Sequence, residues 1–233
     1  MRIHWSHVSF TSLSLIFLCS TTFAYNATDL LDAAAKGEMD KLLKILKTQS
    51  KAYSHAAGPK TTKAQDEKVN INCRNNDERT PLMLASYWGR INAVKALVEN
   101  KADINAVDAD GSSALFFAVA GKCSDVAKYL LEQKANINIR DKNGQTVLMK
   151  AIQCNDIEMV EHFLNSGAEF NIQDKDGCTP LIIAVQKKQY NVIDMLIKKK
   201  ADVNKKDKKN KTALAYAGNN TKLIKLLSTD SAQ

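Results

Sequence analysis

Few side chains suited to catalysis or metal binding remain once the first 24 residues are set aside. Four cysteines are left, separated by 50, 31 and 24 residues, which matches no zinc-binding spacing and includes no C-x-x-C pair. They are Cys73, Cys123, Cys154 and Cys178. No recognisable serine, cysteine or carboxylate arrangement surrounds His55 or His162, and the chain has no glycine-rich phosphate loop or H-E-x-x-H motif. We therefore expect no enzyme activity, no metal site and no cofactor.

The first 24 residues, MRIHWSHVSFTSLSLIFLCSTTFA, have the order of a secretory signal peptide. A single arginine precedes a mostly apolar run from Leu13 to Leu18, and Thr22-Phe23-Ala24 forms a small-x-small cleavage pattern. The run is shorter than the roughly 20 residues that a membrane-spanning helix needs. We expect an exported protein, periplasmic or secreted, with no membrane span after cleavage near Tyr25. The alternative is an uncleaved segment that tethers the protein to a membrane.

The positive charge of the chain is concentrated near its C-terminal end. The full chain has a net charge of +8. Residues 175–225 contain 13 lysines and four aspartates, a net of +9, whereas residues 25–174 contain 19 basic and 20 acidic side chains, a net of −1. A basic patch of this kind attracts anionic partners or serves as a solvated surface.

Three residue types recur with a period of 33, which is the signature of a repeat architecture. Asparagine occurs at Asn72, Asn105, Asn138, Asn171 and Asn204. Leucine occurs at Leu82, Leu115, Leu148, Leu181 and Leu214. Alanine follows each of these leucines three residues later, at positions 85, 118, 151, 184 and 217. Three series in one phase predict stacked copies of a single structural unit.

Each unit predicts two short helices followed by an extended loop. In the unit from residue 76 to 108, Thr80 and Pro81 provide a hydroxyl cap and a proline at the first helical position, and Gly89 ends the first helix. A second apolar stripe, INAVKALV, has the three- and four-residue spacing of a buried helix face. A loop rich in Asp, Asn and Gly follows. Such a unit cannot bury its apolar surface alone, but it can when stacked on copies of itself.

These residues resemble the ankyrin repeat, whose period is 33 and whose signature is T-P-L-H-x-A. The matching segments are TPLMLA, SALFFA, TVLMKA, TPLIIA and TALAYA. The resemblance implies an all-α repeat solenoid of stacked helix-turn-helix units with hairpin-like loops. Lysine replaces the glycine that closes the second helix in three units, at Lys101, Lys134 and Lys200, and each replacement costs up to ~1 kcal/mol. Gly167 keeps the glycine.

We divide the chain into a signal peptide, residues 1–24, and one ankyrin-repeat domain, residues 25–233. The six expected units span residues 27–75, 76–108, 109–141, 142–174, 175–207 and 208–228. The first unit contains an inserted polar loop at residues 48–68, because its closing turn arrives some 18 residues late. Such a loop is either functional or disordered.

Ankyrin repeats in general bind other proteins, and the resemblance places the contact surface on the loop tips and the adjoining inner-helix positions of the concave face. The positions that we assign to partner binding are Asp77, Arg79, Tyr87, Trp88, Asp110, Asn143, Gln145, Gln153 and Lys187. Tyr, Trp and Arg are the residue types most often found as interface anchors, so Arg79, Tyr87 and Trp88 are the main candidates. The alternative is that the inserted loop or a neighbouring unit covers the two aromatic residues as local core.

The lysine-rich segment from Lys198 to Lys211 has two interpretations. It is either a solvated surface of the last units or an electrostatic adaptor for an anionic polymer or membrane surface. It has no arginine and few flanking aromatic residues for base stacking, so we do not expect nucleic-acid binding. We expect a monomer that binds a protein partner.

The cysteines do not predict a disulfide framework. Cys123 and Cys154, near the inter-helix turns of adjacent units, are the only conceivable pair. Stacked helices lie about 8–10 Å apart, so a bond between them would require distortion.

Overall fold

The computed structural model describes residues 25–51 and 69–228, with the side chains of residues 48–51 excepted. The expected signal peptide and most of the expected inserted loop therefore lie outside the described residues. Within these ranges the chain forms twelve α-helices and no named strand. The helices are α1 (Ala27–Lys36), α2 (Met39–Lys51), α3 (Pro81–Tyr87), α4 (Ile91–Glu99), α5 (Ala114–Ala120), α6 (Ser124–Glu132), α7 (Val147–Gln153), α8 (Ile157–Asn165), α9 (Pro180–Gln186), α10 (Tyr190–Lys198), α11 (Ala213–Ala217) and α12 (Thr221–Ser228). Because α2 extends to Lys51, the first four residues of the expected loop are helical.

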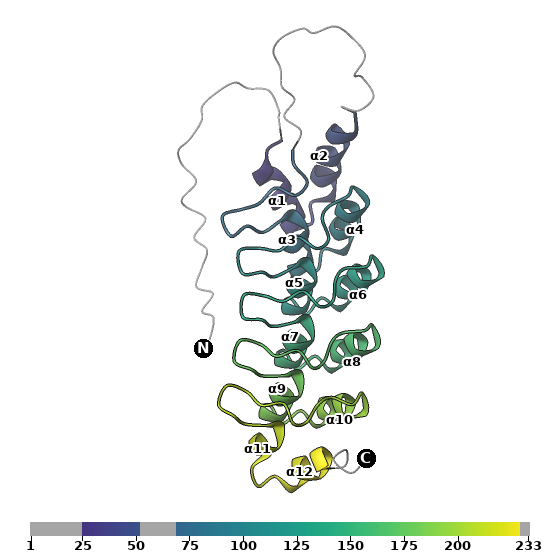
Figure 1. Ribbon diagram of the computed structural model, residues 1–233. Coiled ribbons are helices and arrows are strands. Elements are labelled where there is room, and N and C mark those ends of the chain that lie inside the picture. Colours follow the sequence, from purple (N-terminus) through teal and green to yellow (C-terminus); the bar gives the residue numbers. More distant parts are fainter. Residues whose placement is uncertain (1–24, 52–68, 229–233) are drawn as a thin grey trace.

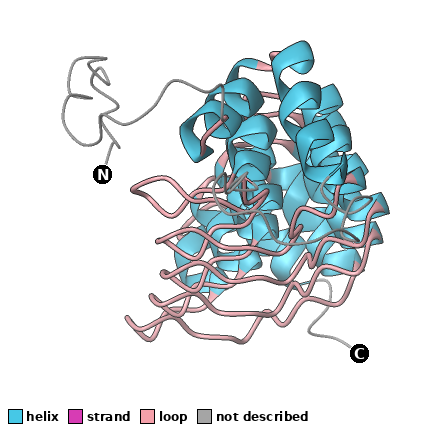
Figure 2. Ribbon diagram, turned by 90° about the horizontal axis from the view of Figure 1, so that it is seen from above, coloured by secondary structure: helices cyan, strands magenta, loops and turns pink. Residues whose placement is uncertain are grey.

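The helices stack in two columns, which confirms the predicted repeat solenoid. The odd-numbered helices form one column, and it lies between the even-numbered helices and the loops (Figure 1). Seen from above, the loops all extend to the same side of the helices (Figure 2). The surface formed by the odd-numbered helices and the adjoining loops is called the concave face below.

The odd-numbered helices begin where the sequence predicts. Thr80 caps α3 by accepting a hydrogen bond from the backbone N–H of Met83, and Pro81 occupies the first turn. Thr146 and Thr179 cap α7 and α9 in the same way. A side-chain oxygen at this position satisfies a backbone donor that has no partner within the helix.

The periodic leucines form the centre of the core. Four of them, Leu82, Leu115, Leu148 and Leu181, are at most 1% exposed, because a neighbouring unit covers each one. Leu214 occupies the same position in the last unit and is 48% exposed. Burial at this position thus depends on the following unit, as expected for a solenoid in which each unit contacts only its neighbours.

The loops are held by a repeated carboxylate or amide oxygen that the sequence analysis did not single out. Asp108 Oδ1 accepts hydrogen bonds from the backbone N–H groups of Asp110 and Ser112, at 2.9 and 2.8 Å. The same pattern recurs at Asn75, Asp141, Asp174 and Asp207. These side chains fold each loop tip into one conformation.

Two further sets of hydrogen bonds join each unit to the next. The periodic asparagines bridge units through their side chains: Asn72 Oδ1, for example, accepts from Asp103 N at 2.9 Å. Adjacent tips are joined through the backbone, by Lys142 N to Asp110 O at 2.7 Å and by equivalent bonds along the array. Asparagine therefore recurs every 33 residues because its side chain joins each unit to the next.

The closing lysines adopt the expected left-handed conformation. The φ angles of Lys101, Lys134 and Lys200 are 69°, 63° and 62°, where Gly167 has 87°. These residues occupy a conformation that favours glycine.

Candidate protein-binding face

The structure brings Arg79 and Tyr87 together against a further residue, Phe117, on the concave face, and Trp88 lies against Tyr87. The rings of Tyr87 and Trp88 meet edge to face, with centroids 5.2 Å apart and planes at 87°. Tyr87 also meets Phe117 edge to face, at 6.3 Å and 81°. The Arg79 guanidinium lies 5.2 Å from the centre of the Phe117 ring. These four residues are called the Trp88 cluster.

Trp88 is the exposed member of the cluster. Its exposed fraction is 56%, whereas Tyr87 and Phe117 are half-buried. No described residue covers Trp88 to the degree expected of core. Aromatic contacts of this geometry stabilise a pair by about 0.5–1.5 kcal/mol beyond the effect of burial, so Tyr87 holds the tryptophan in a defined orientation.

Two carboxylates hold Arg79 over Phe117. Arg79 lies 3.6 Å from Asp108, whose side chain is 3% exposed, and 3.3 Å from the exposed carboxylate of Asp77. Asp108 is the last residue of the unit that contains Arg79, and it also fixes the loop tip at the start of the next unit. The loop geometry of one unit is thereby coupled to the position of a candidate anchor in the preceding unit.

Gly121 allows the backbone at the end of α5 to lie close to the backbone of Tyr87. A Cβ atom at Gly121 would lie 2.0 Å from the backbone oxygen of Tyr87, far inside any tolerated contact. The Cys123 thiol lies nearby, 3.5 Å from the same oxygen. The residues equivalent to Gly121 in the neighbouring units are Trp88 and Cys154, so this position is not restricted to glycine by the repeat itself.

The other predicted binding residues lie along successive units and outside the cluster. Asp110 and Asn143 are exposed at loop tips, and the backbone of Gln145 closes the same tip as Asn143. Gln153 ends α7, and Lys187 is the exposed C-cap of α9. They form an extended surface and not a single pocket.

The last units present a different chemistry. Tyr216 donates a hydrogen bond to Asp207 at 2.5 Å, and this bond, helped by backbone donors from Lys211 and Lys209, holds the pKa of Asp207 below its ordinary value of 3.8. The Lys211 ammonium lies 5.4 Å from the Tyr216 ring centre. Asp207, one of two carboxylates between α10 and α11, is thus turned inward and remains ionised.

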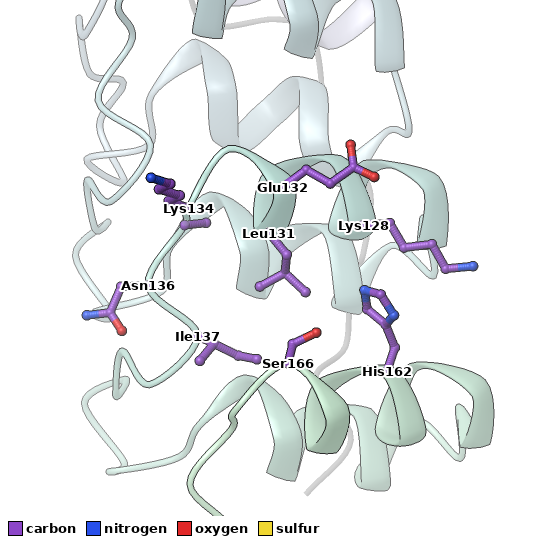
Figure 3. A pocket seen from close by; sticks show the side chains of 9 residues that line it. Lys128, Leu131, Glu132, Lys134, Asn136, Ile137, His162 and Ser166 are labelled. Atoms are coloured by element: carbon purple, nitrogen blue, oxygen red, sulfur yellow. The ribbon is translucent and has the colours of Figure 1, made fainter.

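The outer face has a shallow hollow between α6 and α8, with a volume of about 520 Å³. The His162 side chain points from α8 toward α6, near Lys128 and Leu131 (Figure 3). Lys128 pairs with Glu158 at 2.7 Å, and Glu132 also lines the hollow. Charges of both signs meet here, so the hollow favours no ligand charge, and we assign it no ligand.

All four described cysteines are free thiols. Burial raises the pKa of Cys73 to about 11, and burial together with the neighbouring carboxylate of Asp174 raises that of Cys178 to about 11. Burial also raises the pKa of Cys123, against the opposing charge of Arg90. A thiol that stays protonated is a weak nucleophile.

Residues 25–51 and 69–228 contain neither a metal-binding cluster nor a membrane-spanning helix. No group of three or more His, Cys, Asp or Glu side chains in these ranges could hold a metal ion. None of the helices there combines the length and apolar character needed to cross a membrane.

Comparisons with known proteins agree with the fold. A family profile for ankyrin repeats in three copies matches residues 30–141 and 148–233, and a second, for ankyrin repeats in many copies, matches residues 122–164. The comparison with curated proteins gave no match. Among solved structures, the chain is similar to one in the complex of the Bd0816 predatory endopeptidase from Bdellovibrio bacteriovorus with the immunity protein Bd3460. The TM-score is 0.67 and the identity 28%, over 88% of this chain and 98% of that chain.

Proposed function

Because the chain belongs to the ankyrin-repeat family, a class of generally non-catalytic binding modules, we propose that it binds a protein partner through the Trp88 cluster on its concave face. The observation behind this proposal is that Trp88 is 56% exposed yet held in place by Tyr87. A large, oriented and uncovered aromatic side chain is typical of an interface anchor.

The exposed area of Trp88 is large enough to contribute substantially to the free energy of binding. An aromatic side chain buries about 150–250 Å² in a core or interface, so roughly 80–140 Å² of Trp88 remains to be covered by a partner. At about 25 cal/mol per Å², covering it contributes roughly 2–3.5 kcal/mol. That is the range of an interface hot spot.

The contacts that hold the cluster also reduce the entropy lost on binding. Tyr87 is fixed between Trp88 and Phe117, and Arg79 is fixed by Asp108 and Phe117. Ordering a mobile side chain at an interface costs about 0.5–1.5 kcal/mol, and side chains already in place lose less. The cluster is therefore suited to binding without rearrangement.

The proposal is tested by replacing both aromatic residues, Tyr87→Ser with Trp88→Ser, and measuring capture of proteins from the cells of origin. We expect capture to be lost while the helical circular dichroism is kept. Leu214→Ser is a matched control, since Leu214 is 48% exposed but lies at the far end of the array. Capture that survives the double replacement rules out the aromatic anchor.

Salt separates this function from the electrostatic alternative, in which the segment from Lys198 to Lys211 holds an anionic polymer or a membrane surface. Binding led by charge collapses as salt is added, because the Debye length falls from about 10 Å at 0.1 M to 3 Å at 1 M. Binding led by Trp88 and Tyr87 changes little over the same range.

A second, more specific candidate is that the partner is a peptidase. The support for this candidate is that the similar chain belongs to a solved complex of an endopeptidase with an immunity protein. The test is a peptidase assay on the captured partner, with and without this protein. The candidate is supported if this protein inhibits the peptidase activity of the partner and the double serine variant does not. It is excluded if the partner has no peptidase activity or if this protein leaves that activity unchanged.

We further propose that the protein acts outside the cytoplasm. The support is the signal-like order of residues 1–24. Intact mass of the protein from its native cells is the test: a chain starting near Tyr25 supports export, whereas a chain starting at Met1 supports a tethered or internal protein.

A further inference from the structure

Three exposed lysines stand in register along the loop tips. Lys142, Lys175 and Lys208 each follow the aspartate that folds the tip, and each is 33 residues from the next. Their backbone N–H groups donate to the preceding tip, at Asp110 O, Asn143 O and Asp176 O. The three side chains thus leave equivalent positions in equivalent tips, and all three residues are exposed. They are called the lysine row.

The lysine row has no anionic partner within the described residues. The ion pairs found there involve other lysines, such as Lys198 with Asp194 and Lys128 with Glu158. Asp207, the carboxylate directly before Lys208, is directed inward by Tyr216 and by backbone N–H groups. The ammonium groups of the row are therefore available to an external anion.

The charge of the tips changes from one end of the array to the other. Residues 76–79 and 109–112 each have a net charge of −1, whereas residues 208–211 have a net charge of +3. Lys209 and Lys211 are exposed beside Lys208 and extend the row at its end. The tips between them, residues 142–145 and 175–178, have net charges of +1 and 0. The Trp88 cluster thus lies toward the end of the array with negative tips, and the lysine row runs from residue 142 toward the end with the most positive tip.

The spacing of the row follows from the stacking of the tips. Each unit contributes two chain segments, and adjacent tips are joined by backbone hydrogen bonds, for which neighbouring segments lie about 4.8 Å apart. One unit step is therefore about 9.6 Å, in agreement with the 8–10 Å between packed helices. A polyproline II segment rises about 3.1 Å per residue and has three residues per turn, so every third side chain lies on the same side at intervals of about 9.3 Å.

We propose that the lysine row binds an extended acidic segment of the partner protein that carries Asp or Glu at every third position. Such a segment places one carboxylate opposite each ammonium group without stretching the array. The inference rests on the proposed protein-binding function and specifies the partner: its contact surface is apolar where it meets the Trp88 cluster and acidic where it meets the lysine row.

The test uses two synthetic peptides of the same composition. One has four repeats of Glu-Pro-Pro, and the other has the four glutamates in one block followed by the prolines. We expect the periodic peptide to bind more tightly by fluorescence anisotropy at low salt. We expect Lys142→Gln, Lys175→Gln and Lys208→Gln together to weaken binding of the periodic peptide by roughly 3- to 100-fold, which is the contribution of three exposed ion pairs. The protein with these three replacements is called the row variant. The control removes the same charge from outer helices, with Lys44→Gln, Lys95→Gln and Lys225→Gln.

Each outcome decides the inference. Preference for the periodic peptide, lost in the row variant and kept in the control, supports it. Equal binding of the two peptides, or equal losses in the row variant and the control, overturns it, because net charge alone then explains binding. Binding of phosphatidylserine vesicles without binding of the periodic peptide also overturns it. If capture of the partner requires Trp88 but is not reduced by the three lysine replacements, the inference fails while the proposed function stands.

Discussion

Replacing Gly121 by alanine should push apart the two units that form the Trp88 cluster. The added Cβ would lie 2.0 Å from the Tyr87 carbonyl oxygen and 2.9 Å from its carbonyl carbon. A tolerable separation exceeds 3.0 Å, so the two backbones must move by about 1 Å. Because Gly121 has a φ of −79°, alanine causes no backbone strain there. The whole cost is steric, and overpacking of this kind costs about 1–3 kcal/mol.

The effect should be visible in urea denaturation followed by circular dichroism and tryptophan fluorescence. The free energy of unfolding should fall by about 1–3 kcal/mol, which lowers Tm by roughly 2–12 °C for a chain of this size. Because each unit contacts only its neighbours, weakening one interface should also make unfolding less cooperative.

Cys154→Ala, at the same position one unit later, is the matched control and should change stability little by comparison. A free energy of unfolding for Gly121→Ala within 0.5 kcal/mol of that of the unaltered protein would refute the reasoning, because alanine in open space at this φ is neutral or slightly stabilising.

Three further predictions follow from particular residues. Lys101→Gly should raise the free energy of unfolding by up to ~1 kcal/mol, because φ is 69° there; an unchanged urea midpoint would show that the lysine is not strained. Tyr216→Phe should destabilise the protein near neutral pH by removing the hydrogen bond that lowers the pKa of Asp207. Because a lowered carboxyl pKa stabilises the fold above the ordinary value and this contribution is lost as pH falls, the difference from the unaltered protein should shrink below pH 3.8; a constant difference from pH 6 to 2 would contradict the assignment. Cys73 and Cys178, with pKa values of about 11, should react slowly with iodoacetamide at pH 8 in the folded protein and rapidly in urea, as measured by mass spectrometry; equal rates would contradict their burial.

The sequence predicts the fold well because the unit is local and repeated. Helix caps such as Thr80, the buried leucines and the left-handed position of Lys101 each depend on a few neighbouring residues and recur every 33 residues. Repetition turns a weak local signal into a strong one. The end of α2 was predicted less well: the sequence TQSK has no apolar periodicity, yet the helix continues to Lys51.

The candidate site was predicted only in part, because it depends on contacts between units. Tyr87 and Trp88 could be recognised as residues off the buried stripe, but the contact of Tyr87 with Phe117 joins residues that are far apart in the sequence. Phe117 occupies an apolar position of its own helix and gives no separate signal. The other units have Leu84, Lys150, Ile183 and Tyr216 at this repeat position. The lysine and the tyrosine are typical of a partly exposed position, and this signal could have assigned Phe117 to the concave face.

The role of Gly121 was also beyond sequence reasoning. Gly121 occupies the same repeat position as Trp88 and Cys154 in the neighbouring units. Because both of those residues have side chains, nothing in the repeat pattern requires glycine there. The requirement arises from the local distance between α3 and α5, which is set by packing of both units together.

The most direct test of the central claim is a contact measurement at Trp88 itself. Trp88 is replaced by the photo-reactive p-benzoylphenylalanine, and the same residue is placed at Leu43, a 36% exposed position on the outer helix α2. After irradiation in the native cells, the account predicts that one protein is cross-linked at position 88, that excess unaltered protein competes for it, and that position 43 gives no such product. The same product at both positions, or at position 43 alone, would contradict binding through the concave face.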